Sequence, residues 1–196
     1  MGAEQFIKVD FGSIKNEIEV NPEGIKKLIA RVANNDDSLK DEEVVKAYVG
    51  NSYLSENFTK FDAFGLEGIE ANKRIETAEK KLAKNPLWVD GLEILAYGYG
   101  EAGEMGKSRH YWGVRRKIIE AMAKTGDGTK EHPYYVISID DEYSIMSGIL
   151  NVIPKKQAII GNFDVFNVNS IWDEKNDEKL YFEISRVREI EAENLK

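Results

Sequence analysis

The chain has 196 residues, enough for a core that needs no metal or disulfide, and it contains no cysteine. Its 27 basic and 35 acidic residues give a formal net charge of −8, so we expect no nucleic-acid partner, because binding would need a local basic patch. No apolar run reaches the roughly 18 residues of a membrane span, and no motif indicates a cofactor.

The first 128 residues are predicted to be helical, because their apolar residues recur at helical spacing. The break at Asn21-Pro22 suits a helix cap followed by proline at the first helical position, and Ser38 before Asp41 indicates another helix start. Apolar stripes cover residues 11–18, 25–32 and 44–49. Longer helices are expected over about 66–84, 88–102 and 105–124. The phenylalanines at 58, 61 and 64 are expected to cover the core.

Residues 129–186 are predicted to be β-rich, since the composition changes after Gly126-Asp127-Gly128. We expect strands over 134–139, 157–168 with a bulge at a phase shift, and 180–184, with a short helix through Leu150 and a polar loop over 173–177. The charged tail, residues 187–196, is expected to fray or form a terminal helix. The fold class is therefore α+β: a single domain with a helical portion followed by a small antiparallel sheet.

Residues 85–124 resemble a tetratricopeptide repeat. Pro86 ends the preceding helix, and small residues stand where two helices of such a repeat approach closely. Arg115 departs from the pattern, which has a small residue there, and no second full repeat is visible. The residues at the repeat's packing sites are Leu92, Leu95, Ala96, Tyr99, Ser108 and Trp112.

An ordered set of short segments over roughly residues 38–186 carries a second resemblance. The segments are Asp41-Glu42-Glu43, Tyr48, Tyr53, Ala71-Asn72-Lys73, Lys84-Asn85-Pro86, Leu95-Ala96-Tyr97, Thr125-Gly126-Asp127-Gly128, Tyr135-Val136-Ile137, Asp141-Glu142-Tyr143 and Leu180-Tyr181-Phe182-Glu183-Ile184. Together they are similar to an uncharacterised family common in Bacteroidetes, domain of unknown function 4919. The resemblance implies a bacterial, exported protein of the cell envelope, although residues 1–6 do not look like a signal peptide. It implies no catalytic residues.

One candidate binding face lies on the helix that begins at Trp88. Asp90, Glu93, Tyr97 and Glu101 are three or four residues apart, so they share one helix face. Carboxylates around a tyrosine suit a basic or extended peptide segment. The alternative is an ordinary exposed helix face.

A candidate anion site lies in the basic run of the following helix, at Arg109, His110 and Arg116. The alternative is a solvated face whose arginine stems cover neighbouring aromatic rings. No metal site is expected, because two histidines are too few for zinc, and a helix start explains the acids at 140–142 better than a calcium loop does.

These patterns favour a non-catalytic protein-binding or scaffold module, and the family resemblance implies that it belongs to the bacterial cell envelope. The first alternative is a hydrolase or other enzyme with a site between the helical and β portions, which would need convergent groups with shifted pKa values. The second is a structural envelope protein without a ligand.

Overall fold

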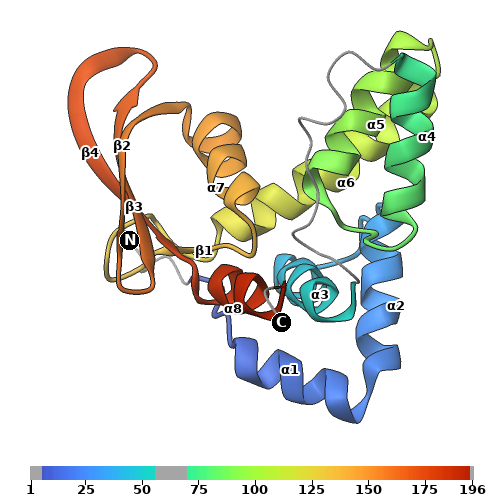
Figure 1. The fold of residues 1–196 in the computed structure, drawn as a ribbon, viewed down its shortest axis with the longest axis horizontal. Coiled ribbons are helices and arrows are strands. Elements are labelled where there is room, and N and C mark those ends of the chain that lie inside the picture. The colour runs from blue at the N-terminus through green and yellow to red at the C-terminus, as the bar shows by residue number, and fades with distance from the viewer. Residues whose placement is uncertain (1–5, 56–69, 195–196) are drawn as a thin grey trace. The chain divides into compact units, whose positions relative to one another are not determined.

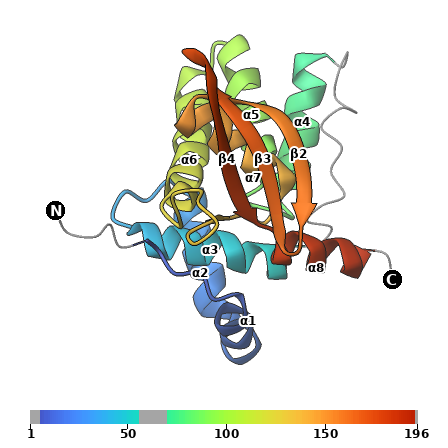
Figure 2. The same cartoon turned by 90° about the vertical axis from the view of Figure 1, so that its left-hand side faces the viewer.

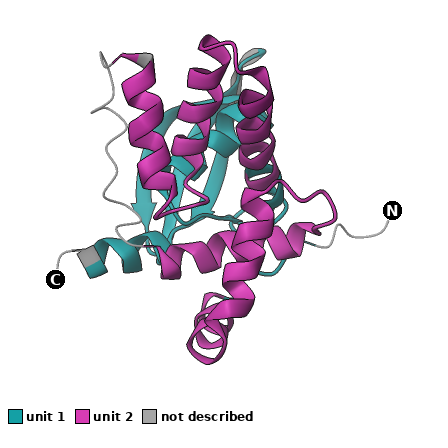
Figure 3. Ribbon diagram, turned by 90° about the vertical axis from the view of Figure 1, so that its right-hand side faces the viewer, with its two compact units in different colours: residues 1–10, 119–196 teal, residues 11–118 magenta. Residues whose placement is uncertain are grey.

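The computed structural model describes residues 6–55 and 70–194, which divide into two compact units (Figure 3). We call residues 11–118 the helical unit, and residues 1–10 with 119–196 the sheet unit. The division falls inside one long helix. Helices and a C-terminal sheet confirm the α+β class, whereas the single domain expected from the sequence stays a prediction.

The helical unit contains the helices predicted from apolar spacing. The expected residues 66–69 and the phenylalanines at 58, 61 and 64 lie outside the described residues. The helices are α1 (Phe11–Val20), α2 (Pro22–Ala33), α3 (Asp41–Leu54), α4 (Ala71–Leu82), α5 (Val89–Glu101) and the greater part of α6 (Met105–Ala123) (Figure 1).

Local capping explains where α2 and α3 begin. The Asn21 side chain accepts a hydrogen bond from the Gly24 amide at 3.3 Å, and Pro22 follows it, as predicted. α3 begins at Asp41, but Ser38 is not its cap. Lys40 holds that position, and its amide donates to Glu43 Oε2 at 2.9 Å.

The first three helices pack around fully buried side chains, among them Ile25, Val32 and Tyr48. α2 and α3 approach closely where α3 carries Gly50. A Cβ at this position would lie 2.4 Å from Ile25 Cγ2, well inside van der Waals contact. The absence of a side chain at Gly50 is therefore a packing requirement.

α5 and α6 are antiparallel helices. Gly103, with φ +78°, follows the end of α5, and the Glu104 amide donates back to the Tyr99 carbonyl at 2.8 Å. Five of the predicted packing residues are buried, but Trp112 is only half-buried. The helix pair is confirmed, while its kinship with tetratricopeptide repeats stays a prediction.

The sheet unit contains a four-stranded sheet in the order β1-β4-β3-β2. β1 is parallel to β4 and the other neighbours are antiparallel, so the sheet is mixed rather than purely antiparallel as expected. Its elements after α6 are β1 (Tyr134–Tyr135), α7 (Ile139–Ile145), the π-helical turn Met146–Leu150, β2 (Val152–Ile160), β3 (Phe163–Ser170), β4 (Asp173–Glu183) and α8 (Ser185–Asn194).

The strand predicted over 157–168 is wrong. β2 and β3 are separate strands joined by a tight turn at Gly161-Asn162, and Gly161 has φ +63°. The change of alternation phase between Phe163-Val165 and Phe166-Val168 lies within β3, which pairs with β4 without a register shift from Phe163 to Val168, so it does not mark a bulge. The polar loop predicted over 173–177 is also wrong, because these residues belong to β4 and the chain turns at Ile171-Trp172.

α7 lies against one face of the sheet, behind β4, β3 and β2 in Figure 2. Tyr143 of α7 meets Phe166 of β3 edge-on at 5.8 Å, and Phe166 meets Phe182 of β4 at 5.7 Å. The tail forms helix α8, in which Arg186 is buried and pairs with Glu189 at 2.8 Å. The terminal-helix alternative is therefore the correct one.

Gly50→Ala is expected to destabilise the protein by about 1–3 kcal/mol, because the added methyl group collides with Ile25. Gly106→Ala is the matched control, since no atom lies within 4 Å of a Cβ there. The control is expected to stabilise by up to about 1 kcal/mol through helix propensity. Urea denaturation measures both, and equal effects would refute the close approach of α2 and α3.

Candidate functional site

The predicted acidic face of α5 is present, but two of its carboxylates already have partners. Glu93 Oε2 lies 2.8 Å from Arg115 Nη2 of α6, and Glu101 Oε2 lies 3.2 Å from Arg74 Nη2 of α4. Asp90, one turn before Glu93, is half-buried. The face therefore carries ion pairs instead of uncompensated negative charge.

Tyr97 is the exposed centre of this face. Its side chain is 58% exposed, and its ring stands edge-on to Trp112 of α6 at 4.9 Å, with 79° between the ring planes. The guanidinium carbon of Arg115 lies 5.7 Å from the Trp112 ring centroid. We call Glu93, Tyr97, Trp112 and Arg115 the aromatic face. Its central ring is held by packing and flanked by an ion pair.

A second tyrosine, Tyr99, lies inside the helical unit. Its hydroxyl donates to the Glu79 carboxylate of α4, and its ring stacks on Tyr111 of α6 at 5.8 Å with only 7° between the planes. Burial, together with the hydrogen bond to the Glu79 carboxylate, raises the pKa of Tyr99 to about 12. Tyr99 therefore joins α4, α5 and α6 as a neutral hydrogen-bond donor.

The predicted anion site is not assembled into one cluster. Arg109 and Arg116 are exposed and seven residues apart, so they share one side of α6. His110 points about 100° away from Arg109 around the helix, and its ring meets Tyr111 edge-on at 5.2 Å. Anion binding by these residues stays a prediction.

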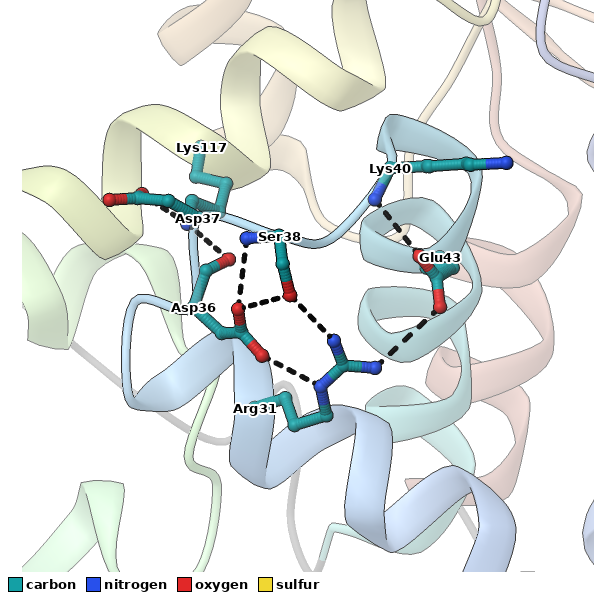
Figure 4. Close-up of polar contacts among 7 residues, drawn as sticks. All are labelled: Arg31, Asp36, Asp37, Ser38, Lys40, Glu43 and Lys117. Atoms are coloured by element: carbon teal, nitrogen blue, oxygen red, sulfur yellow. Dashed lines mark hydrogen bonds and ion pairs between the residues drawn. The ribbon is translucent and has the colours of Figure 1, made fainter.

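A polar network in the loop between α2 and α3 was not foreseen from the sequence (Figure 4). Asp36 Oδ1 accepts hydrogen bonds from the Ser38 amide at 2.9 Å and the Ser38 hydroxyl at 2.7 Å. Arg31 Nε donates to Asp36 Oδ2 at 2.7 Å, while Lys117 Nζ of α6 donates to the Asp36 carbonyl at 2.7 Å and pairs with Asp37 at 3.0 Å. The loop is thus tied to both α2 and α6.

This network holds Asp36 in its ionised form. The hydrogen bonds from Ser38 and Arg31 lower the pKa of the Asp36 carboxyl well below its usual range. Arg31 also reaches Ser38 Oγ at 3.1 Å and Glu43 at 3.7 Å. Each of the residues labelled in Figure 4 makes at least one hydrogen bond or ion pair with another of them, which fits a structural clamp and not a ligand site.

The sheet unit contains a pair of buried acids, Glu142 of α7 and Asp164 of β3. Glu142 has no exposed surface, and neither of its carboxyl oxygens has a hydrogen-bond partner among the residues described. Asp164 is 3% exposed. Its Oδ2 accepts from Gln157 Nε2 at 2.5 Å, while its Oδ1 has no such partner. We call Glu142 and Asp164 the acidic pair.

The helix start predicted from the acids at 140–142 accounts for Asp141 but not for Glu142. Asp141 and Ser138 form a capping box, in which Asp141 Oδ2 accepts from the Ser138 amide at 3.1 Å. Glu142 points into the interior instead. A signal for its partner existed, since Asp164 alternates with Phe166 and Val168 along β3 and therefore shares their covered face.

Burial raises the pKa of Glu142 to about 9, with added repulsion from Asp164, Asp141 and Asp140. Glu142 is therefore protonated in the folded protein at neutral pH. No group of three or more potential metal ligands lies together in the described ranges 6–55 and 70–194. The acidic pair is thus better suited to hold a proton than a metal ion.

The raised pKa of Glu142 predicts that stability falls with pH. Protonated Glu142 contributes its full share to the free energy of unfolding below the ordinary pKa of 4.5. This contribution is lost as pH rises toward about 9, because the unfolded chain releases the proton that the folded protein still holds. Glu142→Gln should make this slope shallower and should stabilise the protein at pH 8. Denaturation at pH 5, 7 and 9 measures the effect.

Glu191→Gln, which removes an exposed acid of α8, is the control and should leave the slope as in the unchanged protein. Equal slopes for the unchanged protein and Glu142→Gln would mean that Glu142 is ionised in the fold.

Comparison with known proteins identifies the family of the chain. None of the α-helices formed by the described residues is long and apolar enough to cross a membrane. Neither the search of curated proteins nor that of solved structures gave a match. The model of the family described as "Domain of unknown function (DUF4919)" matches residues 12–193. The resemblance to domain of unknown function 4919 is thus confirmed over nearly the whole chain, and the chain belongs to the DUF4919 family.

Proposed function

We propose that the protein is a non-catalytic protein-binding module, and that its helical unit receives a segment of a partner protein on the aromatic face. The observation that carries this proposal is Tyr97, a large ring that is 58% exposed yet fixed edge-on against Trp112. Such a ring offers apolar area at a low cost in conformational entropy.

The composition of the aromatic face supports the proposal. Tyrosine, tryptophan and arginine are the residues most enriched where protein interfaces concentrate their binding energy. Here all three lie together, and Trp112 connects Tyr97 to Arg115. A partner side chain that covers Tyr97 would also shield the ion pair between Arg115 and Glu93 from water.

The charges on α5 define the partner more closely. Glu101 is exposed and Glu93 is partly exposed, so a basic residue of the partner can share these carboxylates with the arginines. Since such rim charges act mainly on the association rate, the affinity must come from an apolar residue packed on Tyr97. The partner segment is therefore one that places a basic residue beside an apolar one. The cell envelope, implied by the family resemblance, is the proposed location.

The alternative of an enzyme gains no specific support. Glu142 has a strongly raised pKa, but it has no exposed surface with which to touch a substrate. We therefore do not propose a catalytic role for it.

The test places a photo-reactive phenylalanine at position 97 or at position 143. Tyr143 is the matched control, because it is 44% exposed and also stands edge-on to a buried ring, Phe166, at 77°. A discrete cross-linked protein at position 97, absent at position 143, identifies the partner. With the purified partner, Tyr97→Ser should weaken binding about tenfold or more, the scale of a central interface residue, and Tyr143→Ser should not.

Two results would overturn the proposal. One is an identical cross-linking pattern at both positions. The other is an affinity for the purified partner that Tyr97→Ser leaves unchanged. Binding through the rim charges should also slow as salt rises, because exposed charges are screened over about 10 Å at 0.1 M.

A further inference from the structure

β2 forms an open edge of the sheet. It is the last strand in the order β1-β4-β3-β2, and no other strand of the described residues pairs with its outer side. The residues from Lys155 to Ile160 are all exposed, and Ile159 and Ile160 are exposed by 61% and 59%. A long edge with exposed apolar residues is a template for another strand.

The usual protection of such an edge covers only the first half of β2. Pro154, Lys155, Lys156 and the register shift between Pro154 and Lys156 all discourage pairing there. Gln157-Ala158-Ile159-Ile160 contains no charge, proline or bulge. The second half of the edge is therefore the part open to pairing.

The hydrogen-bond alternation shows which backbone groups this half presents. The Ile184 amide donates to the Asn162 carbonyl at 2.9 Å, so Asn162 and Asp164 direct their backbone groups toward β4. Phe163 and Val165 therefore face β2 and bond to Ile160 and Ala158. It follows that Gln157 and Ile159 direct their amides and carbonyls outward, away from β3.

These outward groups are self-complementary in one antiparallel register. When two β2 strands meet with Ala158 opposite Ala158, Gln157 of each copy faces Ile159 of the other, and both form hydrogen-bonded pairs. Lys156 then faces Ile160, and Lys155 faces Gly161, so no lysine opposes a lysine. The small alanine lies on the two-fold axis, and the exposed isoleucines gain cross-strand neighbours.

We propose that β2 is a self-association edge, where a second copy of this chain continues the sheet through Gln157-Ala158-Ile159-Ile160 about a two-fold axis at Ala158. The interaction is closed, because each copy uses the same edge. It is independent of the aromatic face, since it lies in the other compact unit.

The first test uses the absence of cysteine from the chain. Residues opposite each other at a position without hydrogen bonds lie about 4.5 Å apart between Cα atoms, which a disulfide spans. Under mild oxidation, Ala158→Cys is expected to give a covalent dimer. Ile160→Cys is the matched control: it is equally exposed, but it faces Lys156 and should stay mostly monomeric. Equal cross-linking of the two variants would overturn the proposed axis.

The second test separates backbone pairing from side-chain contact. Ile159→Pro removes an outward amide, which an edge strand tolerates, whereas Ile159→Thr keeps that amide. In analytical ultracentrifugation, the dimer dissociation constant is expected to rise at least tenfold for the proline variant and clearly less for the threonine variant. Amide exchange at Gln157 and Ile159 should slow as protein concentration rises.

Two outcomes count against self-association. If the full chain is monomeric at every concentration up to about 0.5 mM, well above the micromolar range of specific complexes, the proposal is wrong, whether the edge binds a foreign strand or nothing. Equal dimerisation by the proline and threonine variants would also refute it.

Discussion

One hydrogen bond sets the geometry of the helical unit's candidate surface. Ser108 Oγ of α6 donates to the Ala96 carbonyl of α5 at 2.7 Å, and both residues are buried. The Ala96 carbonyl that accepts this bond is part of the α5 backbone. The two helices can come close enough to form it only because both side chains are small. This hydrogen bond fixes the register of the two helices, and this register brings Trp112 under Tyr97 and Arg115 to Glu93.

The sequence predicts the buried contacts between α5 and α6 but not the ion pairs at the surface of the helix pair. Leu92, Leu95 and Ala96 could be predicted as buried because helical spacing places them on one face. Arg115 looked like a departure from the repeat pattern, yet it is the ion partner of a predicted site residue, Glu93. Its role depends on the distance between two helices, which a one-dimensional pattern does not contain. The same holds for Arg74 and Glu101.

In the sheet unit, the single strand predicted over residues 157–168 was wrong, because the apolar pattern did not show where β2 ends and β3 begins. The phase shift between Phe163-Val165 and Phe166-Val168 suggested a bulge, but it lies inside β3, which carries buried apolar residues on both of its faces and pairs with β4 without a break there. The burial of Glu142 could not be predicted, because it depends on which face of α7 meets the sheet. The two units also shift the pKa of an acidic side chain in opposite directions. Asp36 is held charged by donors, whereas Glu142 is held neutral by burial.

The parallel pairing of β1 with β4 has a consequence for synthesis. Tyr134 pairs with Phe182, and the Val136 amide donates to the Glu183 carbonyl at 3.3 Å, so β1 gains its neighbour only when the chain has been made past residue 183. The contacts within residues 11–118 have no such requirement. On the ribosome the N-terminal part of the chain emerges first, so the helices of residues 11–118 can fold before β1 has paired with β4. During this interval the apolar residues destined for the sheet are exposed to other nascent chains and to chaperones.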